Sequence, residues 1–190
     1  MTKIQVMRLF SLLLLLACFT FVACNDDDAV ELDNVLNHDG PNATGPILDP
    51  GSYEFAVRFD QNDFDEVSGD ELTAIQVFVG QLPASVRFLV SEDGTDSTEP
   101  GDIIFDFDAS DDVVAGQFNQ VNLSQNIPLD RPLWLSVLVE HDVRQQSIGC
   151  DSGPRVVDGD WLYQSDDQRW RTYQARTNES INWNIRGLVE

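Results

Sequence analysis

The chain has 190 residues and a mass of 21.3 kDa, a length that fits one domain. Its 33 acidic and 11 basic residues give a formal charge of −22, which excludes a general binder of nucleic-acid backbones, because such binding needs clustered cations. Two histidines and three cysteines leave little material for histidine-based catalysis or a Cys/His zinc site.

Residues 1–23 have the pattern of a bacterial signal peptide. Lys3 and Arg8 precede an apolar run over 9–23, which at about 15 residues is shorter than the 20 or so that a membrane span needs. If Lys3 and Arg8 are removed with this leader, the mature chain keeps nine arginines, no lysine and a formal charge near −24.

The apolar run ends in Phe21-Val22-Ala23-Cys24, and a small residue before a cysteine at this place resembles the lipobox of bacterial lipoproteins. By that resemblance Cys24 is acylated and becomes the mature N-terminus. An ordinary secretory signal that contains a cysteine and acylation at Cys18 are the alternatives. Acyl chains contribute about 0.8 kcal/mol per buried methylene, so two or three of them anchor a protein firmly in a membrane.

An acidic stretch, Asn25-Asp26-Asp27-Asp28, follows Cys24 directly. It resembles the short export signal beside the lipidated cysteine in surface lipoproteins of Bacteroidota-type bacteria; a solvated spacer is the alternative. We therefore expect an outer-membrane lipoprotein exposed at the cell surface, with the membrane as a partner through the anchor. The rest of 24–50 is poor in large apolar residues and rich in turn formers, which predicts a flexible acidic tether.

Residues 51–190 show a hydrophobic period of two, which is typical of half-buried strands. Short apolar runs recur about every ten residues and are separated by turns rich in Gly, Pro and Asp, a pattern that is typical of an antiparallel β-sandwich. The fold class that we predict is all-β, an antiparallel, jelly-roll-like β-sandwich of about eight or nine strands. The expected strands cover 53–59, 72–79, 86–90, 103–108, 118–123, 133–139 and 181–185, with a hairpin from 161 to 170.

The hairpin is the best candidate for a ligand-binding surface. Trp170 lies between Arg169 and Arg171, which places an aromatic ring beside hydrogen-bond donors. Cross-strand packing of Trp170 within the hairpin is the alternative and the commoner arrangement. Trp134 and Trp183 lie in apolar runs and are predicted to be buried in the core.

Oxygen-rich loops raise the possibility of structural calcium as a cofactor. Asp106 and Asp108 share one strand face at period two and are weak candidate ligands, with a charged, solvated face as the alternative. The acidity as a whole also fits adaptation to a salty habitat.

Asp96-Ser97-Thr98 resembles the three-residue O-glycosylation signal of secreted Bacteroidota proteins, which makes Ser97 a weak candidate for glycosylation.

Catalytic residues are not predicted. Cys150 and His141 could form a nucleophile–base pair, but a lone cysteine is more often a small core residue. Carboxylate pairs suited to glycoside hydrolysis cannot be recognised from the sequence, because 33 acidic residues place some pair at any distance.

Motifs in the C-terminal part resemble a β-sandwich module of large secreted Bacteroidota surface proteins, found beside adhesin-type domains and secreted peptidases. They are Gly149-Cys150-Asp151-Ser152-Gly153-Pro154, Asp158-Gly159-Asp160-Trp161, the Trp170 hairpin and Asn182-Trp183-Asn184-Ile185-Arg186-Gly187-Leu188-Val189. The resemblance extends over 52–190 and implies a non-catalytic accessory domain with no fixed ligand. We therefore expect a surface-anchored binding or adhesion protein for a glycan or a protein ligand. The alternative is a structural subunit or partner of a cell-surface complex without a small ligand.

Overall fold

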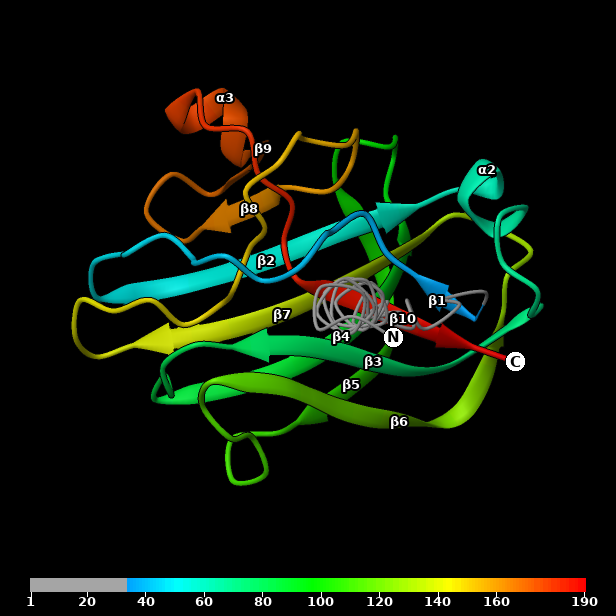
Figure 1. Cartoon of the computed structure of the whole chain (residues 1–190), viewed down its shortest axis with the longest axis horizontal. Helices are drawn as coiled ribbons and strands as arrows, with labels where there is room; N and C mark the ends of the chain where they lie inside the picture. Colours follow the sequence, from blue (N-terminus) through cyan, green and yellow to red (C-terminus); the bar gives the residue numbers. More distant parts are fainter. Residues whose placement is uncertain (1–33) are drawn as a thin grey trace, which may run out of the picture. The chain divides into compact units, whose positions relative to one another are not determined.

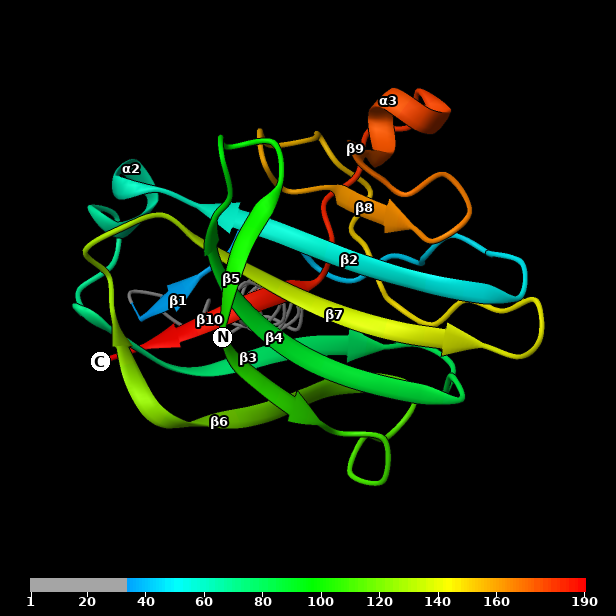
Figure 2. The ribbon, with the colours of Figure 1, turned by 180° about the vertical axis from the view of Figure 1, so that it is seen from behind.

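Two antiparallel sheets pack face to face in the computed structural model, which describes residues 34–190 (Figures 1 and 2). The smaller sheet has the order β1 (Val35–Leu36), β10 (Ile185–Val189), β3 (Glu71–Val79) and β6 (Gln117–Pro128). The larger sheet has the order β5 (Pro100–Asp108), β4 (Ser85–Asp93), β7 (Leu133–His141), β2 (Gly51–Phe59), β8 (Trp161–Gln164) and β9 (Arg169–Thr172). Two short helices, α2 (Gln61–Phe64) and α3 (Tyr173–Thr177), complete the described elements.

The strand order is that of a jelly roll with one added hairpin. If the β8–β9 hairpin is set aside, eight strands remain, and the last of them, β10, lies between β1 and β3 while β7 lies between β2 and β4. This arrangement is a double-sheet jelly roll, and it confirms the predicted fold class. The strands of the described residues number ten, one more than the upper number predicted, because β1 lies in a segment for which no strand was expected.

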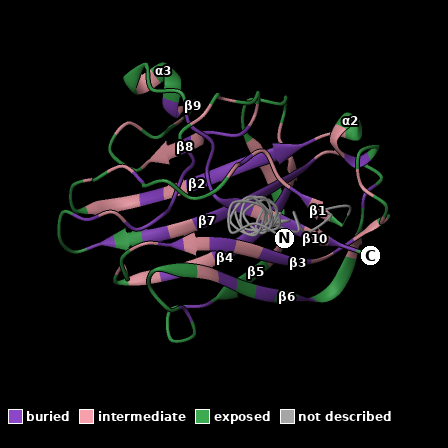
Figure 3. Cartoon of the chain, viewed as in Figure 1, coloured by how far each residue is buried: buried purple, intermediate pink, exposed green. Residues whose placement is uncertain are grey.

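The core lies between the sheets and follows the predicted alternation. Along β2, Phe55 and Val57 point inward and are almost fully buried, and the central strands β2 and β7 are largely buried (Figure 3). The Trp183 ring meets the Phe55 ring edge-on at 4.9 Å and is fully buried, as predicted. Packing of this kind contributes beyond the buried area of the rings.

The last strand lies later in the chain than we predicted. Residues 181–184 are irregular, and β10 begins at Ile185. The alternating pattern nevertheless gave the burial correctly for Ile181, Trp183 and Ile185. It failed for Asn182 and Asn184, which are also buried because their amides are used in hydrogen bonds.

The prediction of a flexible tether over 24–50 is wrong for residues 34–50. Val35 and Leu36 pair with Leu188 and Gly187 of β10, and the side chain of Leu36 is buried in the core. Farther on, Thr44 pairs with Cys150 in an isolated bridge. The signal peptide, Cys24 and the acidic stretch lie outside the described residues.

A buried ion pair holds this segment in place. The Asp39 carboxylate, whose side chain is fully buried, accepts hydrogen bonds from Arg186 Nε and Nη2 at 2.8–3.0 Å and another from the Asn184 amide. The Asp151 carboxylate adds a second attachment, because it accepts from the Gly40 N–H at 3.0 Å and from the Asn182 N–H at 2.7 Å. The Asp39–Arg186 pair and the hydrogen bond from Gly40 to Asp151 each join residues more than 100 positions apart, which composition alone cannot predict.

We expect Asp39→Ala to lower the free energy of unfolding by about 3–5 kcal/mol, because it leaves the Arg186 guanidinium without its buried partner. Denaturant unfolding of the full chain measures the effect. Asp49→Ala is the control, since the Asp49–Arg144 pair is exposed and 3.5 Å apart, and its loss should change stability by at most about 0.5 kcal/mol. Equal effects of the two substitutions would contradict the role of Asp39.

Candidate functional site: the outer face of the larger sheet

The outer face of the six-stranded sheet carries an ordered grid of side chains. Paired residues on neighbouring strands face the same side, so the register defines rows that run across the strands. One row crosses all six strands; we call it the cross-strand row, and it consists of Asp108, Arg87, Leu138, Glu54, Tyr163 and Trp170. Its members are half-buried except Asp108, which is exposed.

Four aromatic side chains cluster on this face. The Trp134 ring lies 5.4 Å from that of Trp161 and 5.7 Å from that of Trp170, and the Tyr163 ring lies 5.6 Å from that of Trp170. Trp134 is fully buried beneath its neighbours, whereas the other three rings keep part of their surface exposed. Ala56 on β2 pairs with Trp161, and its small side chain leaves space for the rings above the sheet.

The cluster corrects our expectation for Trp134. It is buried as predicted, but on the outer face of the sheet and not in the core between the sheets. The nearly continuous apolar run of β7 could not distinguish the two faces.

A charged network borders the cluster. Arg58 is almost buried, and its Nε and Nη2 atoms donate to the Asp93 carboxylate at 2.7 and 2.8 Å, while Nη1 donates to Asp158 at 3.1 Å. The same two carboxylates accept the indole N–H groups of Trp134 and Trp161. Hydrogen bonding to Arg58 lowers the pKa of Asp93, so this carboxyl stays ionised at neutral pH.

Glu54 lies at the centre of the cross-strand row, between Leu138 and Tyr163. Its Oε1 atom accepts a hydrogen bond of 2.6 Å from the Ser136 hydroxyl. Burial raises the pKa of the Glu54 carboxyl, and the hydrogen bond from Ser136 opposes this only in part. A carboxylate that is costly to bury, with one oxygen left for a ligand, is a feature of binding sites.

Two donors of the cross-strand row have no protein acceptor within the described part of the chain: the hydroxyl of Tyr163, the partner of Glu54, and the indole N–H of Trp170 on the next strand. The other three indole N–H groups all donate to protein oxygens, which for Trp183 is the carbonyl of Trp161. Both donors are open to water at the partly exposed edge of the aromatic cluster, where a ligand could reach them.

The predicted trio of Trp170, Arg169 and Arg171 does not form one site. Successive side chains of β9 alternate between the two faces, so both arginines point away from the face on which Trp170 lies. The cross-strand packing that we weighed as the alternative is present, because Trp170 is the partner of Tyr163. The period-two alternation from which the strand was predicted already implies that Arg169 and Arg171 lie on the opposite face from Trp170.

The residues of this candidate site that sequence reasoning did not single out are Glu54 and Arg58, whereas Tyr163 lies in the hairpin that was predicted. Glu54 and Arg58 alternate with the apolar residues of β2, which marks them as members of the outer face. That signal could not reveal that they meet Trp134 and Trp170, because the register across β7, β2, β8 and β9 is needed for this.

Asp106 and Asp108 do share one strand face, but an arginine lies between them. Arg87 Nη2 is 2.7 Å from Asp106 Oδ2, and Arg87 Nη1 is 3.6 Å from Asp108 Oδ2. The guanidinium thus occupies the space between the two carboxylates and offsets one of their two negative charges. Within residues 34–190, three or more His, Cys, Asp or Glu side chains are nowhere grouped so as to hold a metal ion.

Cys150 and His141 have separate surroundings. Burial raises the pKa of the Cys150 thiol to about 12, which leaves almost no thiolate at neutral pH. His141 is buried and its Nε2 atom lies 2.7 Å from the Ser147 hydroxyl. The buried, protonated thiol of Cys150 is that of a small core residue.

Ser97 lies in the exposed turn between β4 and β5. The side chain of Asp96 accepts a hydrogen bond from the Thr98 N–H at 2.8 Å, which shapes the turn. The position is accessible to a modifying enzyme, and glycosylation at Ser97 stays a prediction.

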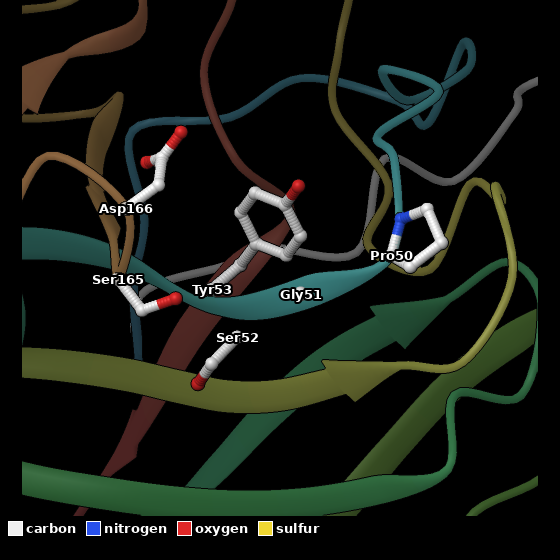
Figure 4. A pocket seen from close by; sticks show the side chains of 6 residues that line it. All are labelled: Pro50, Gly51, Ser52, Tyr53, Ser165 and Asp166. Carbon is white, nitrogen blue, oxygen red and sulfur yellow. The ribbon is translucent and has the colours of Figure 1, made fainter.

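A small pocket lies at the start of β2, between that strand and the turn of the β8–β9 hairpin (Figure 4). It is lined by Pro50, Gly51, Ser52, Tyr53, Ser165 and Asp166 and has a volume of about 80 Å³. Ligand pockets usually measure about 300–1,000 Å³, so this one has room for waters but not for a sugar.

Comparisons with known proteins add no assignment: no protein-family model matches the chain, and no curated protein matches it significantly. In residues 34–190 no helix is long and apolar enough to cross a membrane.

We expect Glu54→Gln to raise the melting temperature at neutral pH, by a few degrees at most, because the uncharged amide avoids the cost of a buried charge and can still accept from Ser136. The raised pKa means that the wild type loses stability as pH rises from the ordinary carboxyl pKa of about 4.3 through its folded value. The difference between the proteins should therefore disappear below about pH 4.

Thermal melts of the full chain at several pH values measure this effect. Glu71→Gln is the control, because the Glu71 carboxylate accepts from Asn126 at an exposed position of the other sheet. A lower melting temperature for Glu54→Gln at neutral pH would show that the Glu54 carboxylate is stabilising instead.

We expect Cys150 to resist alkylation in the native protein at pH 8 and to react after unfolding, because burial suppresses the thiolate. Mass spectrometry of the peptide that contains Cys150, after treatment with iodoacetamide with and without denaturant, measures this. Rapid labelling of the native protein would contradict the buried position.

Proposed function

We propose that this protein is a surface-anchored, non-catalytic binding or adhesion lipoprotein of the outer membrane, with a glycan or a protein as ligand. The anchor rests on the lipobox-like sequence at Cys24 and the acidic stretch after it. The resemblance of 52–190 to accessory modules of Bacteroidota surface proteins also favours this reading.

One observation carries the binding role. The outer face of the larger sheet exposes aromatic rings beside a half-buried carboxylate and two donors that have no acceptor in residues 34–190. Aromatic surface with a few directed polar groups is the usual composition of a ligand site. A face that served only to cover the sheet would not need Glu54, which is costly to bury.

A different surface favours the alternative, a structural subunit or partner in a cell-surface complex. Strand β5 forms one edge of the larger sheet, and three of its apolar side chains are exposed: Ile103, Ile104 and Phe107. A long edge strand presents unpaired backbone groups on which another chain can pair. Bulges between β4 and β5 and the acidic side chains of β5 reduce this tendency, which makes it the second candidate.

A glycan and matrix-protein array with the full chain in detergent, with calcium and with EDTA, tests the binding role. We expect a signal that Trp170→Ala reduces at least about tenfold, because the substitution removes the exposed ring. Phe118→Ala on the other sheet is the control and should keep the signal. Circular dichroism verifies that both variants are folded.

Two results would count against the binding role: a blank array, or a signal that Trp170→Ala leaves unchanged. Crosslinking on intact cells, with a partner attached near Phe107, would then establish the alternative. A signal lost only in EDTA would show that calcium takes part in binding.

A further inference from the structure

We infer that the cross-strand row binds a neutral glycan, with sugar rings packed against Tyr163 and Trp170 and sugar hydroxyls bonded to Glu54. This inference rests on the proposed binding role and names its ligand class. The row spans five steps between strands, which makes a strip of about 24 Å. Such a strip fits a chain-like ligand better than a compact one.

The polar groups of the row match the chemistry of a sugar. The Glu54 Oε2 atom can accept, and the Tyr163 hydroxyl and the Trp170 indole N–H can donate. A sugar hydroxyl both donates and accepts, so neighbouring hydroxyls can satisfy all three groups. The apolar face of C–H bonds on the same sugar can rest on the exposed parts of the rings.

Charge excludes an acidic ligand. Arg87 is the one cation of the row, and it is already paired with Asp106 and Asp108. Glu54 would lie against any anionic group placed over the aromatic cluster, and the chain as a whole carries a formal charge of −22. Sulfated and uronic-acid polymers should therefore be rejected.

The composition of the row also argues against a protein ligand. Tyr163, Trp170 and Arg87 are residue types that protein interfaces also use. Glu54 and Asp108, however, place two carboxylates in the row, and acidic side chains are depleted at the centre of such interfaces. A peptide would have to bring a cation to Glu54, and its binding would then weaken strongly with salt. A neutral glycan needs no such cation.

Affinity electrophoresis and tryptophan fluorescence of the full chain in detergent test the inference. The probes are soluble mannan, soluble β-glucan and galactan as neutral polymers, with alginate and dextran sulfate as anionic ones. We expect binding to at least one neutral polymer and to neither anionic one. The affinity should change less than about twofold between low salt and about 0.5 M salt, since no charge pair forms.

Two conservative variants separate binding from folding. Glu54→Gln should weaken binding roughly tenfold, because hydrogen bonds to a charged group are the stronger kind, even though this variant should melt at a higher temperature. Tyr163→Phe should weaken binding roughly fivefold by removing one hydroxyl. Glu71→Gln and Tyr53→Phe, which alter groups away from the row, should keep the wild-type affinity.

The possible failures are distinguishable. No binding to any neutral polymer, preference for the anionic ones, or unchanged affinity of both row variants would overturn the inference. Capture of a matrix protein on the array that Trp170→Ala abolishes would overturn it too, yet leave the proposed binding role intact. No binding to any glycan or protein would overturn both.

Discussion

Arg58 is a nearly buried cation on the outer face of the larger sheet, and the shape of that face depends on how its charge is balanced. Its partners, Asp93 and Asp158, lie at the end of β4 and before β8, so the ion pairs draw two distant segments toward β2. The same carboxylates accept the indole N–H groups of Trp134 and Trp161. One charge thus fixes both the border of the face and the orientation of the rings. A buried charge is a costly means to that end, but it defines one arrangement where apolar contacts alone would allow several.

Three further arginines of the described residues pair with carboxylates on other segments. Arg186 attaches the first segment through Asp39, Arg176 bonds the Asp167 carboxylate in the β8–β9 turn, and Arg87 joins the acidic side chains of β5. The Arg186 and Arg176 pairs connect segments that no strand ladder joins, whereas Arg87 reinforces the ladder between β4 and β5. In a chain with so many carboxylates, a few well-placed cations therefore decide which loops are fixed.

The sandwich could be predicted because its strands are amphipathic at period two, as in β2, where Phe55 and Val57 alternate with Glu54 and Arg58. The N-terminal segment could not be predicted, since its attachment through Asp39 depends on a partner 147 residues away. The site was found only in part. Trp170 was identified from its residue type and its place in a predicted hairpin. Glu54 became a candidate only once the register showed that it pairs with Tyr163. Alternation assigns side chains to a face, but neighbours on that face depend on the order of the strands.

The two ends of the described chain meet on one sheet, where the Val189 N–H donates to the Asn34 carbonyl. The candidate binding face belongs to the other sheet. If the protein is tethered ahead of Asn34 and pulled by a ligand on the far face, the mechanical load must pass through the core between the sheets. The first contacts to bear it are the two-residue strand β1 and the Asp39–Arg186 pair behind it. Under such a load, the fold would open at the β1 segment before the candidate binding face is disturbed.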